Sequence, residues 1–146
     1  MKKLLVIGAS GFLGWYVCMH PQEDWEIIGT WKSNKNGIPR GIKNVQLDLN
    51  KTEQLKAVFK KVKPDAVMHL AALSDTGFCE QNIQKSLHTN VTATKMLTDY
   101  CGQKGIPFLF TSSGQVFDGL SNESYSESNE TNPQNVYGLH KAQAEK

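Results

Sequence analysis

The chain has 146 residues, 39% of them hydrophobic and 21% charged, with a formal net charge of +2. This length suits one domain with a real core, while the small charge and the lack of any apolar run near the roughly 20 residues of a membrane span argue against nucleic acid and membranes as partners. The three widely spaced cysteines argue against a disulfide framework or a zinc site, so we expect a reducing compartment, the cytoplasm, and no metal.

The first half of the chain alternates short apolar runs with helical patterns. Continuous apolar runs of this length are typical of strands that are buried on both faces. In chain order we expect a strand at Leu4–Ile7, a helix at Phe12–His20, a strand at Trp25–Trp31, a loop at Lys32–Lys43, a strand at Val45–Asp48 and a helix at Thr52–Val62.

The second half continues the alternation and ends on a helix. Gly105 and Pro107 are stop signals for the helix before them. We expect a strand at Ala66–Leu70, a long helix from near Glu80 to Gln103, a strand at Phe108–Thr111, a polar, turn-rich segment at Ser112–Thr131 and a last helix that begins near Pro133 to Val136.

Alternating strands and helices predict an α/β fold with a doubly wound parallel sheet. Right-handed crossovers favour the strand order 3-2-1-4-5 of a Rossmann fold. We therefore expect one dinucleotide-binding domain over residues 1–146. Its ligands should bind beyond the carboxyl ends of the strands, where the segments after each strand meet.

A glycine-rich turn follows the first strand and opens the first helix. Glycine allows positive φ and close approach of the backbone to a pyrophosphate, and a helix N-terminus favours phosphate. Glycines also make ordinary turns, so the spacing alone is weak evidence. In this strand-turn-helix context we expect cofactor contacts from Gly8, Ser10, Gly11, Phe12, Leu13 and Gly14.

The end of the second strand bears on the choice of cofactor. An acidic residue there usually binds the ribose 2′-hydroxyl of NAD, but this chain has Trp31, Lys32 and Ser33. Lys32 and Ser33 could hold a 2′-phosphate by charge and hydrogen bonds. The sequence therefore favours NADP, and NAD stays open. Solvent-facing loop positions are the alternative interpretation of these residues.

Tyr137 and Lys141 stand four residues apart in the last predicted helix. Residues at this spacing share a helix face, and a nearby ammonium favours the phenolate form of a tyrosine. The pair could therefore donate and accept a proton near neutral pH. Ser113, just after the fifth strand, could hydrogen-bond a substrate carbonyl, although the neighbouring Thr111 and Ser112 carry hydroxyls too.

The chain resembles the extended short-chain dehydrogenase/reductase family, and most of all its dTDP-4-dehydrorhamnose reductase branch. The motifs that carry the resemblance keep the family order over the whole chain. They are Gly8–Gly14, Leu47–Leu49, His69–Ala72, Asn90, Thr111–Gly119 and Asn135–Lys141.

The resemblance implies roles for individual residues. Tyr137 would be the proton donor, Lys141 would hold the nicotinamide ribose, and Ser113 would complete a catalytic triad. It also implies that Asp48 and Leu49 contact the adenine and that Asn90 supports the site. Ala71, Ala72 and Leu73 would contact the central part of the cofactor.

The resemblance also has two departures. Gly114 and Gln115 stand where the reductase branch usually has Asp and Tyr, and family members are about twice as long. We therefore expect a chain truncated before the substrate domain, and an exposed strand edge that favours a homodimer.

Three functions follow as hypotheses. The first is an NADP(H)-preferring reductase of a nucleotide-linked 4-keto-sugar. The second is a non-catalytic dinucleotide-binding or regulatory module, and the third is a sugar-nucleotide epimerase or dehydratase that uses the same triad.

Overall fold

The computed structural model describes residues 1–21 and 23–146, which form two compact units. The first unit comprises residues 1–71 and 97–111, and the second comprises residues 72–96 and 112–146. Helix α5 (Ala93–Lys104) starts in the second unit and ends in the first. The single domain expected over residues 1–146 stays a prediction.

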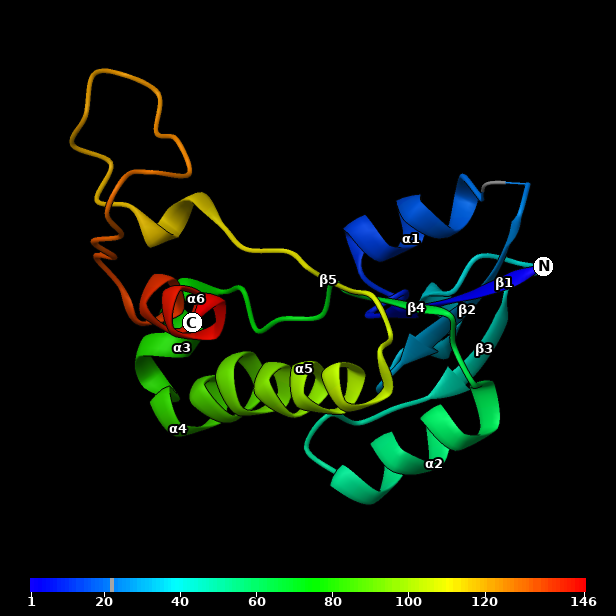
Figure 1. Cartoon of the computed structure of the whole chain (residues 1–146). Coiled ribbons are helices and arrows are strands. Elements are labelled where there is room, and N and C mark those ends of the chain that lie inside the picture. The colour runs from blue at the N-terminus through cyan, green and yellow to red at the C-terminus, as the bar shows by residue number, and fades with distance from the viewer. Residues whose placement is uncertain (22) are drawn as a thin grey trace. The chain divides into compact units, whose positions relative to one another are not determined.

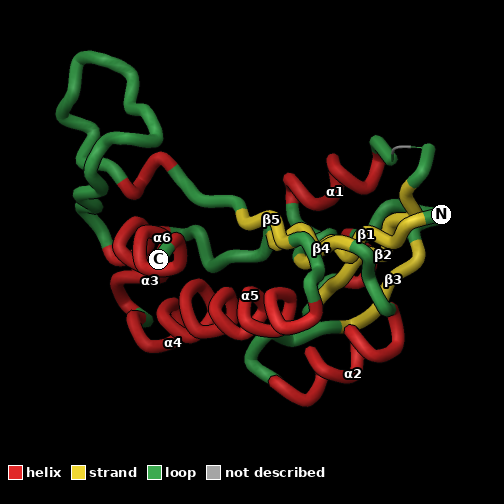
Figure 2. Tube along the Cα trace, in the orientation of Figure 1, coloured by secondary structure: helices red, strands yellow, loops and turns green. Residues whose placement is uncertain are grey.

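The first unit is built on one parallel sheet of five strands in the order β3-β2-β1-β4-β5 (Figures 1 and 2). This order confirms the predicted doubly wound α/β fold. The central strand β1 ends in Leu5, Val6 and Ile7, which are at most 1% exposed. The strands are β1 (Lys2–Ile7), β2 (Trp25–Trp31), β3 (Lys43–Gln46), β4 (Ala66–His69) and β5 (Phe108–Phe110).

The third strand lies two residues earlier than the sequence predicts. Its register pairs Ile28 with Lys43 and Trp31 with Gln46, so β3 ends where β2 ends. The Leu47 N–H still donates to the Trp31 carbonyl at 2.9 Å. Asp48 therefore lies in the loop beyond the strand rather than in it, at the carboxyl edge of the sheet.

Helices cover both faces of this sheet. Helix α1 (Phe12–Met19) lies on one face, and α2 (Thr52–Val62) and the end of α5 lie on the other (Figure 1). Helix α2 buries one apolar stripe and ends at Lys63, which adopts the left-handed conformation with φ 52°. The buried cluster beneath α1 consists of Val6, Ala9, Cys18, Ile27 and Ile38.

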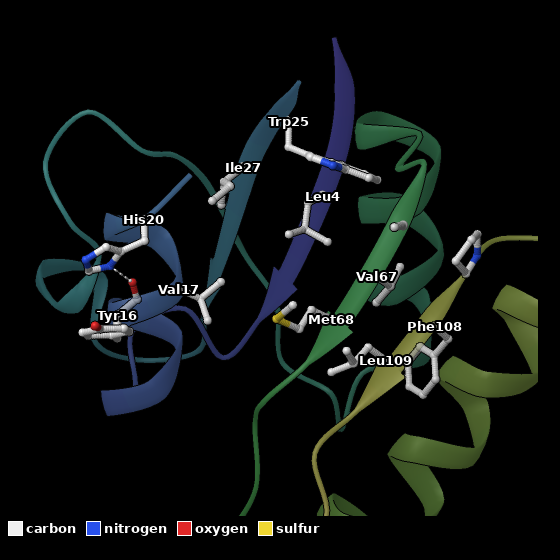
Figure 3. A pocket seen from close by; sticks show the side chains of 12 residues that line it. Leu4, Tyr16, Val17, His20, Trp25, Ile27, Val67, Met68, Phe108 and Leu109 are labelled. Carbon is white, nitrogen blue, oxygen red and sulfur yellow. Dashed lines mark hydrogen bonds between the residues drawn. The ribbon is translucent and has the colours of Figure 1, made fainter. Parts of the chain in front are cut away.

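An apolar groove of about 530 Å³ opens on the α1 face of the sheet (Figure 3). Tyr16 and His20 of its α1 wall stack with ring centroids 4.3 Å apart. None of the predicted cofactor residues lines this groove. Its lining is Leu4, Tyr16, Val17, His20, Trp25, Ile27, Ala66, Val67, Met68, Pro107, Phe108 and Leu109.

The second unit consists of short helices and a long loop. The single helix expected from Glu80 to Gln103 is wrong, because Asn82 leaves the helical region with φ −133° and ψ 53°. Its side chain donates to the Phe78 carbonyl at 3.0 Å and ends the first piece. The pieces are α3 (Thr76–Gln81), α4 (Ile83–Leu87), a π-helical turn (His88–Thr92) and the start of α5.

The last part of the second unit begins with a short 3-10 helix (Gly114–Val116) and ends with α6 (Val136–Glu145). Residues 117–135 between them form a loop (Figure 2). Phe117 and Tyr125 stack in it with ring centroids 4.4 Å apart, and the Tyr125 hydroxyl donates to Asp118. No helix in the described part of the chain is long and apolar enough to cross a bilayer.

Candidate functional site

The glycine turn after β1 is held by contacts that exclude any side chain. Gly8 has φ +91°, and a Cβ added to it would lie 2.7 Å from the Ala71 amide nitrogen. A Cβ on Gly14 would lie 2.2 Å from the Gly8 carbonyl oxygen. Both glycines are therefore required by the packing of the turn against the segment that follows β4 and against the start of α1.

Gly11 differs from these two glycines. It caps α1 in an extended conformation, with φ −88° and ψ 171°, and without a side-chain capping bond. A Cβ there would have one close neighbour, the Gly8 carbonyl oxygen at 3.3 Å. Packing alone would therefore tolerate a small side chain at position 11. A backbone left bare at an uncapped helix N-terminus, where the dipole favours anions, fits a pyrophosphate.

Two residues that support this turn were missed in the sequence. The Thr30 hydroxyl, in a side chain that is 2% exposed, accepts the Gly8 N–H at 3.2 Å. A Cβ on Gly37 would lie 2.8 Å from the Ser10 carbonyl oxygen. Gly37 belongs to a short 3-10 helix (Lys35–Gly37) capped by Asn34. The loop expected at Lys32–Lys43 thus packs against the turn, which no local sequence pattern indicates.

Lys32 and Asp48 meet beyond the ends of β2 and β3. The Lys32 ammonium lies 3.2 Å from a carboxylate oxygen of Asp48. Partial burial of Asp48 opposes ionisation, but the hydrogen bond from the Asn50 N–H and the Lys32 ammonium outweigh it and lower the pKa of Asp48. Lys32 remains half-exposed, so its charge is accessible from solvent.

Two neighbours of this ion pair are held by contacts within the fold. The Trp31 indole N–H donates to Asn44 at 3.1 Å, and Leu49 is 7% exposed. Ser33 is exposed. The structure thus brings Lys32, Asp48 and the glycine turn together at one edge of the first unit, as the parallel strands predict.

Asn90 organises the start of the second unit. Its side-chain oxygen accepts the Leu73 N–H at 2.8 Å, and its amide nitrogen donates to the Leu73 carbonyl at 2.9 Å. The Thr94 hydroxyl donates to the Asn90 carbonyl at 2.8 Å. Asn90 therefore fixes the segment after Ala72, and its role in supporting a cofactor site stays a prediction.

Helix α6 carries Tyr137 and Lys141 on a face that is buried. Asn135 caps the helix by accepting the Gly138 N–H at 2.8 Å. Tyr137 is 8% exposed and Lys141 only 2%. Burial lowers the pKa of Lys141 to about 8, against an opposing effect of the Glu145 carboxylate. Lysine is rarely this buried unless it is paired, and a buried group with a strongly shifted pKa is a candidate functional residue.

Ser113 begins the 3-10 helix that packs against α6. Its hydroxyl accepts the Gln115 N–H at 3.2 Å, and a Cβ on Gly138 would lie 2.1 Å from the Gln115 carbonyl oxygen. The segment of Ser113 thus meets the helix turn of Tyr137. The neighbouring Ser112 hydroxyl instead donates a hydrogen bond to the Glu145 carboxylate.

The predicted site residues therefore fall into two groups, one in each unit. The groups' convergence on one cofactor stays a prediction. Among residues 1–21 and 23–146 no three His, Cys, Asp or Glu side chains are grouped as metal ligands. The first group comprises the glycine turn, Trp31, Lys32, Ser33, Asp48, Leu49 and Ala71, and the second comprises Ala72, Leu73, Asn90, Ser113, Tyr137 and Lys141.

Comparison with known sequences finds a family model and relatives that match almost the whole chain. The family model described as RmlD substrate binding domain matches residues 1–146. The probable low-salt glycan biosynthesis reductase Agl14 of Haloferax volcanii is 30% identical over 96% of this chain and 46% of its own length. Methionine adenosyltransferase 2 subunit beta of Xenopus tropicalis is 30% identical over 99% of this chain and 42% of its own length.

Comparison with solved structures also finds matches over almost the whole chain. A hypothetical dTDP-4-dehydrorhamnose reductase from Sulfolobus tokodaii matches with a TM-score of 0.87 and 30% identity, over 99% of this chain and 50% of that one. A Brucella ovis UDP-glucose 4-epimerase in complex with NAD matches with a TM-score of 0.87 at 25% identity, over 99% of this chain and 46% of that one. A Bacillus anthracis dTDP-4-dehydrorhamnose reductase in complex with NADP shares the fold, with a TM-score of 0.84 at 21% identity over 99% and 48%. The chain thus spans about half the length of the proteins it matches.

Proposed function

Because the chain belongs to the RmlD substrate binding domain family, we propose that it is the dinucleotide-binding part of an NADP(H)-preferring reductase of a nucleotide-linked 4-keto-sugar. The relationship itself is to sugar-nucleotide reductases, epimerases and dehydratases. The observation that carries the proposal is the buried Lys141, one helical turn from Tyr137 on α6.

The residues of the first unit fit the phosphate end of a dinucleotide. The turn at Gly8 and Gly14 is closed by its own packing, while Gly11 leaves the N-terminus of α1 bare. We propose that amides of this first turn bind the pyrophosphate.

The residues of the second unit fit the proton transfer that accompanies reduction. The dinucleotide, when bound, supplies the hydride. The Tyr137 hydroxyl donates the proton to the substrate's carbonyl oxygen, and the Ser113 hydroxyl donates a hydrogen bond to the same oxygen. The Lys141 ammonium favours the phenolate that Tyr137 leaves behind.

Lys32 is the basis for proposing NADP over NAD. Its half-exposed ammonium lies beyond the end of β2, where a 2′-phosphate would need a cation, and its ion-pair partner Asp48 lies in the loop beyond β3. The related structures hold NADP in one case and NAD in another, which supports a nicotinamide dinucleotide but leaves its type to experiment.

The test measures binding and turnover separately. The chain is titrated with NADPH and NADH by calorimetry, and NADPH oxidation is then followed with dTDP-4-dehydrorhamnose. We expect tighter binding of NADPH than NADH, and turnover that Tyr137→Phe removes while NADPH affinity stays within about two-fold. Failure of both dinucleotides to bind would contradict the proposal.

A non-catalytic module is the second candidate. One relative, 30% identical over 99% of this chain, is named as a subunit of a methionine adenosyltransferase. NADPH binding without turnover of the keto-sugar would favour this function. Release of tightly held NAD from the purified chain would instead favour the epimerase or dehydratase chemistry.

A further inference from the structure

A buried hydrogen bond joins helices α4 and α6 next to the proposed catalytic pair. The Ser86 hydroxyl oxygen of α4 lies 2.8 Å from Nδ1 of His140 on α6. Ser86 is fully buried and His140 is 3% exposed. Ser86 and His140 are 54 positions apart, so no local pattern in the sequence pairs them.

The direction of this bond follows from the partners of Asn90. Its amide nitrogen has two protons, one donated to the Leu73 carbonyl at 2.9 Å and the other to the Ser86 hydroxyl oxygen at 3.2 Å. The Ser86 hydroxyl accepts that bond and keeps its own proton. Donation of this proton to Nδ1 of His140 would place the ring proton on Nε2.

The charge state of His140 agrees with this direction. Burial lowers the pKa of His140 below its ordinary value, so the ring is neutral at neutral pH with one nitrogen available to accept. The titratable groups near His140 on α6 are Tyr137, Lys141 and Glu145. A further carboxylate, Glu80 of α3, accepts the Val136 N–H at 2.8 Å.

The position of His140 ties this bond to Lys141. His140 precedes Lys141 and follows Tyr137 by three residues on the same helix. Each residue of an α-helix turns the side-chain direction by about 100°, so a fixed partner for His140 also fixes the directions of Tyr137 and Lys141. Asn90, which anchors Ser86, is itself fixed by both backbone groups of Leu73.

We propose that Ser86 and His140 are positioning residues whose hydrogen bond sets the rotation of α6 and keeps the Lys141 ammonium buried beside Tyr137. Its consequence for catalysis rests on the proposed function. The bond itself, and its effect on Lys141, do not.

The experiment follows Lys141 directly by NMR of lysine labelled with ¹³C at Cε, and Lys141→Met identifies its signal. The pKa of Lys141 is measured in the wild type and in Ser86→Ala, His140→Leu and His140→Asn. Ser86→Ala and His140→Leu should each raise it by about one unit, because a rotated α6 returns the ammonium to water. In His140→Asn the side-chain oxygen can replace Nδ1 as acceptor, so the pKa should stay within about 0.3 units of wild type.

Two further readouts complete the test. The ¹⁵N shifts of His140 should show the proton on Nε2 in the wild type. NADPH affinity should fall about five- to tenfold in Ser86→Ala and His140→Leu, and a double variant should lose no more than either single one.

The outcomes separate this proposal from the proposed function. An unchanged Lys141 pKa in Ser86→Ala, even with a lower melting temperature, would show a merely structural bond and overturn the proposal. The same holds if His140→Asn behaves like His140→Leu. If the wild type does not bind NADPH while the Lys141 pKa still moves as expected, the bond positions Lys141 and the proposed function fails.

Discussion

Gly11 and Gly14 are three residues apart in one turn, yet alanine should affect them in opposite ways. At Gly14 the added Cβ would lie 2.2 Å from the Gly8 carbonyl oxygen and 2.7 Å from the Ala9 Cα. At Gly11 its one close neighbour would be the Gly8 carbonyl oxygen at 3.3 Å, and the backbone conformation there suits any residue. Gly14→Ala should therefore damage the fold, whereas Gly11→Ala should damage the phosphate site.

The magnitudes follow from these contacts. Overpacking against rigid backbone costs about 3 kcal/mol, and the better helix propensity of alanine returns about 1 kcal/mol, so Gly14→Ala should lose about 2 kcal/mol of unfolding free energy. In Gly11→Ala the gain of about 0.4–1 kcal/mol from a less flexible unfolded chain offsets the tight contact, leaving a change within about 0.5 kcal/mol. A methyl group where a pyrophosphate approaches should weaken NADPH binding by more than about tenfold, or 1.4 kcal/mol.

The assay compares urea unfolding with NADPH titration for each variant. Gly102→Ala is a matched control, because a Cβ at that position of α5 meets nothing within 4 Å. It should keep wild-type affinity and gain up to about 1 kcal/mol. The reasoning is refuted if Gly11→Ala binds NADPH as the wild type does, or if it unfolds as easily as Gly14→Ala.

Three other substitutions probe the same sites. Lys32→Gln should raise the dissociation constant for NADPH about tenfold and leave that for NADH unchanged in calorimetry; equal losses for both would remove the basis for NADP preference. Gly37→Ala should weaken NADPH binding several-fold, because its Cβ would push on the Ser10 carbonyl oxygen at 2.8 Å. The control Gly102→Ala, whose Cβ meets nothing within 4 Å, should show no such loss of NADPH affinity. Burial lowers the pKa of Lys141 from 10.5 to about 8, so the unfolded chain binds more protons between these values and the wild type should gain about 3 kcal/mol relative to Lys141→Met as pH rises from 8 to 10.5. Parallel urea unfolding curves at the two ends of that window measure this difference, and a constant offset would contradict it.

The sheet order could be predicted because its determinants are local. Most strands contain an apolar run followed by a glycine, proline or polar turn. Parallel pairing with right-handed crossovers then leaves few arrangements. The glycine turn and the capped helix of Tyr137 were equally readable, since their signals lie within a few residues of one another.

The errors have physical causes that local patterns do not carry. Asn82 breaks the long helix because its side chain bonds to the Phe78 carbonyl, an alternative that helical periodicity conceals. The third strand ends early because its register is set by pairing with β2, which the apolar pattern of one strand does not specify. Thr30, Gly37, Ser86 and His140 act through partners far away in the sequence.

The hydrogen bonds of Asn90 restrict which amino acids can evolve at that position. Both amide protons and the side-chain oxygen are engaged at once, by Leu73 and Ser86. Aspartate has the reach but no protons to give, and glutamine has the groups but one methylene too many for a side chain that is 1% exposed. Two of these partners are backbone groups of residue 73 that no substitution there removes, so asparagine at position 90 is held in place by the path of the chain as well as by the Ser86 side chain.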